Sequence, residues 1–138
     1  MKKNKRYRIE LSEDQLRMII NCVEDCSRFM SGQVELEHTT DILDNWDEVQ
    51  EELTKKIKPL VTPRLSFNAS YDWAGSSCSN EKQKKFIQAS YYLYRELLHQ
   101  WTLMQDADDW NVYNSPTLRC EGSGEVIKLE LIDKNKEK

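Results

Sequence analysis

The chain has 138 residues, of which 38% are hydrophobic and 32% are charged, and its formal net charge is −4. This size and composition predict one folded domain, residues 1–138, and exclude a disordered chain. The negative charge argues against binding to duplex nucleic acid, and no segment approaches the length of a membrane span.

The N-terminal residues are basic and then alternate in polarity. We expect residues 1–5 to fray, and a frayed basic end is favoured over a nucleic-acid-binding arm. Tyr7, Ile9 and Leu11 alternate with charged residues, which predicts a half-buried β-strand. No apolar signal core follows, so we expect a cytoplasmic protein.

The first helix is predicted between Ser12 and Gly32. Ser12 and Gln15 have the spacing of a capping box, and Gly32 occupies the position of a C-terminal glycine. Between them, apolar residues recur with the 3.6-residue period of a buried helix face. These residues are Leu16, Ile19, Ile20, Val23, Cys26 and Met30.

The four cysteines, Cys22, Cys26, Cys78 and Cys120, lack the spacing of a zinc site. In the absence of an export signal, we expect reduced thiols with structural roles. Cys26 and His99 could form a nucleophile–base pair, but small buried cysteines are far commoner. Asp25 and His99 could form an acid–base pair, but no phosphate loop, nucleophile elbow or metal motif accompanies them. We therefore expect no enzymatic activity, no metal and no cofactor.

A second helix is predicted from a cap within residues 39–41 to the prolines Pro59 and Pro63. Its first half is acidic and its end is rich in lysine, which suits the helix macrodipole and explains the acidic residues without a metal. Residues 62–80 are predicted to form an irregular loop, with a short strand at residues 65–71 as the alternative. The apolar stripe of this helix is Ile42, Trp46, Val49, Leu53, Ile57 and Leu60.

The third helix is predicted over residues 80–105, and strand candidates follow at residues 110–113 and 126–132. We therefore expect an α+β fold, in which three main helices pack on a small antiparallel sheet formed by the N- and C-terminal strands. Residues 134–138 should fray. Because the last strand has apolar residues on both faces, an exposed edge could pair with a second copy. The core stripe of the third helix is Phe86, Ile87, Leu93, Tyr94, Leu97, Leu98, Trp101 and Met104.

Two motifs resemble small uncharacterised proteins of bacteriophages and prophages. The run DCSRFMSGQ, residues 25–33, is similar to the end of the family's first helix, with an aspartate, an arginine and a final Gly-Gln pair. The run YYLYRELLH, residues 91–99, is similar to the family's last helix. The residues before the final strand, 110–116, are also similar. The resemblance implies a phage accessory protein and brings no catalytic residues.

Polar residues on the flanks of the first and third helices predict a ligand site. The guanidinium groups of Arg28 and Arg95 are forked donors suited to phosphate or carboxylate, and nearby aromatic rings could stack on a base. The alternative is a structural, salt-bridged helix end. The candidate ligand-binding residues are Asp25, Arg28, Gln33, Tyr91, Arg95, His99 and Tyr113.

We expect a non-enzymatic accessory protein in the bacterial host that binds, and thereby sequesters, a small nucleotide-like anion such as a host immune signal. The alternative function is a protein-binding modulator of a host factor. Such docking could use the acidic part of the second helix or the aromatic residues in 67–73. The expected partners are thus a small ligand or a host protein, and a homo-oligomer is also considered.

Overall fold

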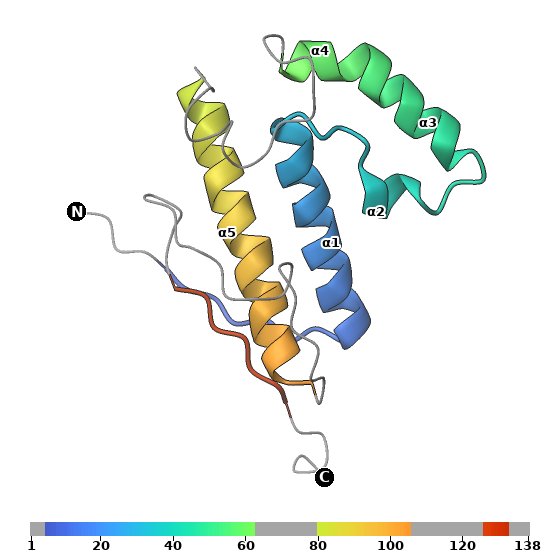
Figure 1. Ribbon diagram of the computed structural model, residues 1–138. Coiled ribbons are helices and arrows are strands. Elements are labelled where there is room, and N and C mark those ends of the chain that lie inside the picture. The colour runs from blue at the N-terminus through green and yellow to red at the C-terminus, as the bar shows by residue number, and fades with distance from the viewer. Residues whose placement is uncertain (1–4, 63–79, 106–125, 133–138) are drawn as a thin grey trace.

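The computed structural model describes residues 5–62, 80–105 and 126–132 (Figure 1). Two long helices, α1 and α5, run antiparallel and side by side, and a shorter helical arm leaves the C-terminal end of α1 (Figure 1). The helices are α1 (Glu13–Met30), α2 (Glu37–Thr40), α3 (Trp46–Glu52), the π-helical η1 (Leu53–Ile57), α4 (Lys58–Val61) and α5 (Glu81–Leu103).

Helix α1 begins and ends where the sequence predicts. The Ser12 hydroxyl accepts from the Gln15 N–H at 3.1 Å, and the Gln15 side chain accepts from the Ser12 N–H at 2.9 Å, which forms the predicted capping box. After the helix, Gly32 has a φ of +103°, a conformation that favours glycine. Both end signals are therefore confirmed.

The buried face of α1 differs from the prediction. Ile20 is fully buried, but Ile19 and Cys26 are exposed. The polar residues Glu24 and Asp25 are buried instead. The reason is that α1 packs against α5 on one side and α2 on another, so two faces of the helix are covered.

Helix α5 also begins as predicted, because the Asn80 side chain caps it by accepting from the Gln83 N–H at 3.1 Å. The Gln83 amide then donates to the Met30 carbonyl at 2.8 Å, which joins the start of α5 to the end of α1. At the opposite end, the Trp101 indole N–H donates to Glu13 at 3.2 Å. Among residues 5–62, 80–105 and 126–132, few apolar side chains are buried, namely Ile20, Val34, Ile87, Tyr92 and Tyr94.

The predicted second helix is instead an arm of four pieces, because α2 is separate and α3, η1 and α4 follow one another from Trp46. Its apolar stripe does not reach the core: Ile42 is 84% exposed, and no residue of α3 or η1 is buried. Pro59 does not stop the helix. It lies in the first turn of α4, where a missing N–H leaves no helical hydrogen bond unmade.

The predicted α+β fold with an antiparallel sheet is wrong, since the part of the chain that the structure describes is helical and contains no β-strand. Residues 5–12 and 126–132 are elongated segments that do not form a ladder (Figure 1). The Arg6 side chain binds the Val126 carbonyl at 2.8 Å, and the Gln100 side chain binds the backbone of Ile127 and Leu129. Side chains thus take hydrogen bonds that a sheet would use.

Several predictions concern residues outside the described ranges. These are the strand candidate at 110–113, residues 63–79 of the predicted irregular loop, and the predicted frayed ends at 1–4 and 134–138.

Candidate functional site

Asp25, a predicted ligand residue, caps α2. Its carboxylate accepts from the backbone N–H groups of His38 at 3.2 Å and Thr39 at 2.8 Å, in the first turn of that short helix. The residue at the N-cap position, Leu36, makes no side-chain cap and has a left-handed φ of 50°. Asp25 is 2% exposed, so its two carboxylate oxygens replace the missing local cap.

The preceding residue, Glu24, holds two basic side chains. One carboxylate oxygen lies 2.7 Å from Arg28 Nη2, and the other lies 3.2 Å from His38 Nε2. The Glu24 side chain is only 11% exposed, whereas those of Arg28 and His38 are 31% and 39% exposed. A buried carboxylate thus orients two nitrogen-bearing groups that both remain partly open to solvent.

Tyr94 on α5 is the next member of this cluster. Burial raises the pKa of Tyr94 to about 12, and the negative charge of Glu24 adds to the shift. Burial acts to lower the pKa of Arg28, but the charge of Glu24 and a hydrogen bond to Tyr94 outweigh it, so the pKa of Arg28 is raised. Arg28 therefore stays cationic, and the Tyr94 hydroxyl keeps its proton at neutral pH.

Arg95 and Tyr91 lie on the other side of Tyr94. Arg95 Nη1 donates to the Tyr91 hydroxyl at 3.1 Å, and its guanidinium carbon lies 5.5 Å from the Tyr91 ring centroid. The Tyr91 ring meets the Tyr94 ring edge-on, with centroids 5.7 Å apart. The charges of Arg28 and Arg95 both act on Tyr94, so arginines from the two long helices flank one tyrosine.

The remaining predicted site residues contribute less or cannot be placed. The Gln33 backbone N–H donates to the Arg28 carbonyl at 2.8 Å, and His99 is half-buried on α5, one turn beyond Arg95. Tyr113 lies outside the described residues.

Sequence reasoning missed Glu24 and His38. The i, i+4 spacing of Glu24 and Arg28 could have identified Glu24 as the partner of Arg28. No local pattern links His38 to Glu24, because a turn and a loop separate them.

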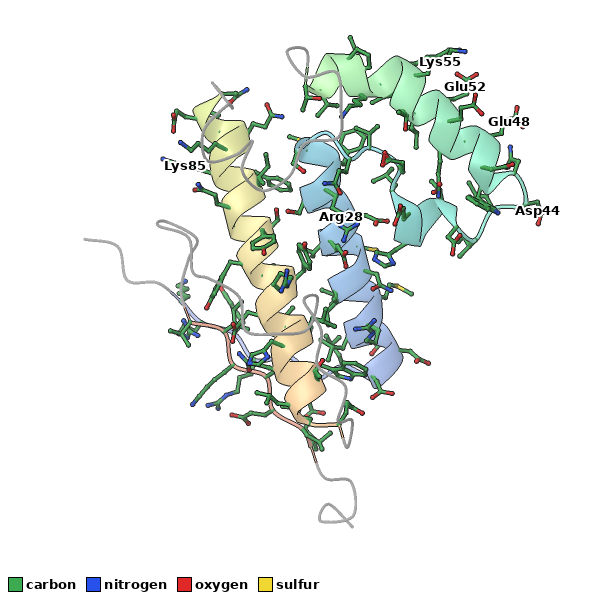
Figure 2. The ribbon with its side chains drawn as sticks, in the orientation of Figure 1. Arg28, Asp44, Glu48, Glu52, Lys55 and Lys85 are labelled. Atoms are coloured by element: carbon green, nitrogen blue, oxygen red, sulfur yellow. The ribbon has the colours of Figure 1, made fainter. Side chains whose placement is uncertain are left out.

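The arm carries a second candidate surface. An open groove of about 480 Å³ lies along it, lined by Glu35, Trp46, Asp47, Gln50, Glu51, Thr54 and Lys55. Asp44, Glu48, Glu52 and Lys55 follow the outer side of the arm in Figure 2. Ile42, Leu43 and Trp46 are exposed beside these charges. This combination of exposed apolar residues and carboxylates is typical of a protein-binding surface.

Cys22 and Cys26 are free thiols, and both are exposed rather than packed in the core. In residues 5–62, 80–105 and 126–132, no group of three or more His, Cys, Asp or Glu side chains is placed to hold a metal ion. Within the same ranges, no helix combines the length and apolarity needed to cross a membrane. Comparisons with protein-family models, curated proteins and solved structures found no match to this chain.

Proposed function

We propose that this protein binds a small anionic, nucleotide-like ligand through Arg28 and His38. The observation that carries the proposal is the buried Glu24 carboxylate, which bonds to both side chains while each keeps about a third of its surface exposed. A buried carboxylate that fixes a guanidinium and an imidazole in a partly open position prepares both groups for an anion with little loss of conformational entropy. Here Glu24 is a positioning residue.

The chemistry of the cluster suits phosphate. Arg28 can present N–H donors beyond the one that binds Glu24, because a guanidinium carries five. The second ring nitrogen of a protonated His38 adds a donor from α2, and the half-buried Tyr91 brings aromatic surface from α5. Together these groups fit an anion attached to a flat ring, which is the chemistry of a nucleotide.

In biological terms, we propose a non-enzymatic accessory protein of a phage or prophage that sequesters a nucleotide-like signal of its host. The resemblance of residues 25–33 and 91–99 to phage proteins supports this context.

The test is calorimetric titration with nucleoside monophosphates, diphosphates and cyclic dinucleotides. We expect Arg28→Ala and His38→Ala each to weaken binding about tenfold or more, since each loses a charge-assisted hydrogen bond. Arg28→Lys should lie between Arg28→Ala and the unmodified chain, because it keeps the charge but loses the fork.

Lys85→Ala is the matched control. Lys85 is exposed on α5 and points away from α1 in Figure 2. Affinity that falls equally in Lys85→Ala would indicate general charge attraction. Affinity unchanged in Arg28→Ala would contradict the proposed site.

A second candidate function, docking of a protein partner on the arm, is favoured by the exposure of Trp46 beside the groove. The carboxylates of the arm predict a basic partner. Binding should then weaken in Trp46→Ala and in D47K/E51K, which change residues that line the groove, when lysine-rich and glutamate-rich peptides are compared by fluorescence anisotropy. Equal binding of both peptides would contradict this function.

A further inference from the structure

The C-terminal segment, residues 126–132, has one edge bound to α5. Gln100 Nε2 donates to the Ile127 carbonyl at 2.7 Å, and Gln100 Oε1 accepts from the Leu129 N–H at 2.7 Å. In an extended chain, alternate residues direct their N–H and C=O groups to the same edge. The side-chain amide of Gln100 thus occupies the edge to which Ile127 and Leu129 belong.

The opposite edge belongs to Lys128 and Glu130. Both residues are exposed, and no other described residue makes a hydrogen bond to their backbone groups. Further along this edge, the Val126 carbonyl accepts from Arg6. The apolar residues Val126 and Leu131 are 59% and 74% exposed. An extended edge with open backbone groups and exposed apolar side chains is a template for pairing with another chain.

We infer that this edge pairs antiparallel with the same segment of a second copy, about a two-fold axis at Leu129. The segment reads VIKLELI, and this register places Lys128 opposite Glu130 of the second copy, and Glu130 opposite Lys128. Two oppositely charged cross-strand pairs form at once, and cross-strand pairs of this kind stabilise antiparallel strands. The sequence is therefore self-complementary, as a two-fold interface requires.

The same register agrees with the backbone contacts. When Leu129 faces its own copy as a non-hydrogen-bonded pair, the neighbouring Lys128–Glu130 pairs are the ones that exchange N–H···O bonds. Those are the groups on the open edge, so the contact of Gln100 with Leu129 stays intact. The side chains of Val126 and Ile132 then lie opposite each other and cover apolar surface that is exposed in the single chain. The backbone ladder stops short of this pair, because the Val126 carbonyl on the same edge already accepts from Arg6.

Charge reversal tests this pairing in the full-length chain. We expect the unmodified protein to dimerise in analytical ultracentrifugation, and K128E or E130K to weaken dimerisation at least tenfold, because like charges then face each other twice. The double variant K128E/E130K restores opposite charges and should dimerise like the unmodified protein. An equimolar mixture of the two single variants should form mixed dimers.

Both residues are exposed, so these variants should keep the circular dichroism spectrum and melting temperature of the unmodified chain. An unmodified chain that stays monomeric at all concentrations in analytical ultracentrifugation would overturn the inference. A dimer that is indifferent to K128E and E130K would also overturn it, because another surface would then be responsible.

Cross-linking tests the register independently. Leu129→Cys places two thiols at the two-fold axis, at a Cα separation of about 4.5 Å that suits a disulfide. Ile127→Cys is the matched control, since the two substituted positions then lie about four residues apart along the strands. Oxidation should trap a dimer of Leu129→Cys only. Equal trapping in both variants and in the unmodified chain would contradict this register.

Discussion

The ammonium group of Lys58 donates to the carbonyl oxygen of Gly32 at 2.9 Å, and this bond fastens the far end of the arm to the C-terminal end of α1. Lys58 is 6% exposed. Burial lowers its pKa, and the nearby Glu35 carboxylate partly offsets that effect. A positive charge at this position also suits the negative end of the α1 dipole. The arm is thus held by Asp25 at α2, and at α4 by Lys58 and by the Gln83 side chain of α5, which donates to the Val61 carbonyl at 3.3 Å.

Gly32→Ala tests the attachment of the arm to α1. A Cβ at Gly32 would lie 3.0 Å from Cγ2 and Oγ1 of Thr62, at a φ of +103° that disfavours alanine. We expect a loss of about 2 kcal/mol or more in unfolding free energy, measured by chemical denaturation. Thr62→Ala in the same chain removes both close atoms, so the double variant should lose less than the sum of the single changes.

Asp25→Ala distinguishes a structural aspartate from a ligand-binding one. Its removal leaves the His38 and Thr39 N–H groups of the first turn of α2 without their acceptor, which should cost about 1 kcal/mol of unfolding free energy. Asp25→Asn keeps one acceptor and should lose less. A melting temperature unchanged in Asp25→Ala, together with a loss of ligand affinity, would show that Asp25 acts as a ligand residue instead.

Alkaline pH should destabilise the protein through Tyr94. Its pKa is raised from an ordinary value near 10 to about 12 in the folded state, so the folded protein holds the proton that the unfolded chain releases. The resulting stability is fully present below pH 10 and is lost as the pH rises toward 12, by about 2–3 kcal/mol.

Tyr94→Phe is the control for this measurement. Lys58 has a lowered pKa and therefore acts in the opposite sense, with stability rising as the pH approaches its ordinary value of 10.5. Lys58 is present in both chains, so its effect cancels in the comparison. Between pH 9 and pH 11.5, the unfolding free energy should fall less in Tyr94→Phe than in the unmodified chain. Equal losses in the two chains would mean that Tyr94 does not titrate as described.

Gln100→Leu should release residues 126–132 from α5. The variant keeps the bulk of the side chain but removes the bonds to Ile127 and Leu129. Hydrogen exchange at the Leu129 amide should become at least tenfold faster, because that N–H loses its acceptor. Gln105→Leu is the matched control, since the Gln105 side chain, just after α5, bonds to the Trp101 carbonyl rather than to residues 126–132. Slow exchange retained in Gln100→Leu would show that other contacts hold the segment.

The helix ends could be predicted because their signals are local. Ser12 with Gln15, Gly32, and Asn80 each act within a few residues along the chain, and the structure places α1 and α5 accordingly. Periodicity was less informative about burial. It marked the two long helices but assigned Ile19 and Cys26 to the core, because a period does not reveal how many neighbours a helix has.

The sheet and the site depended on contacts between distant residues. Alternation at 126–132 indicated an extended segment, but only the tertiary structure shows that the Gln100 side chain, rather than a neighbouring strand, takes its hydrogen bonds. In the same way, Arg28 could be predicted from the sequence as a ligand-binding residue. His38 could not, because it reaches Glu24 only after α2 folds back onto α1. The two long helices could be predicted from the sequence alone, because capping hydrogen bonds and the apolar repeat both involve residues that are close along the chain. Tertiary structure decided the partners of the buried carboxylates, because burial leaves a charge stable only where distant donors converge on it.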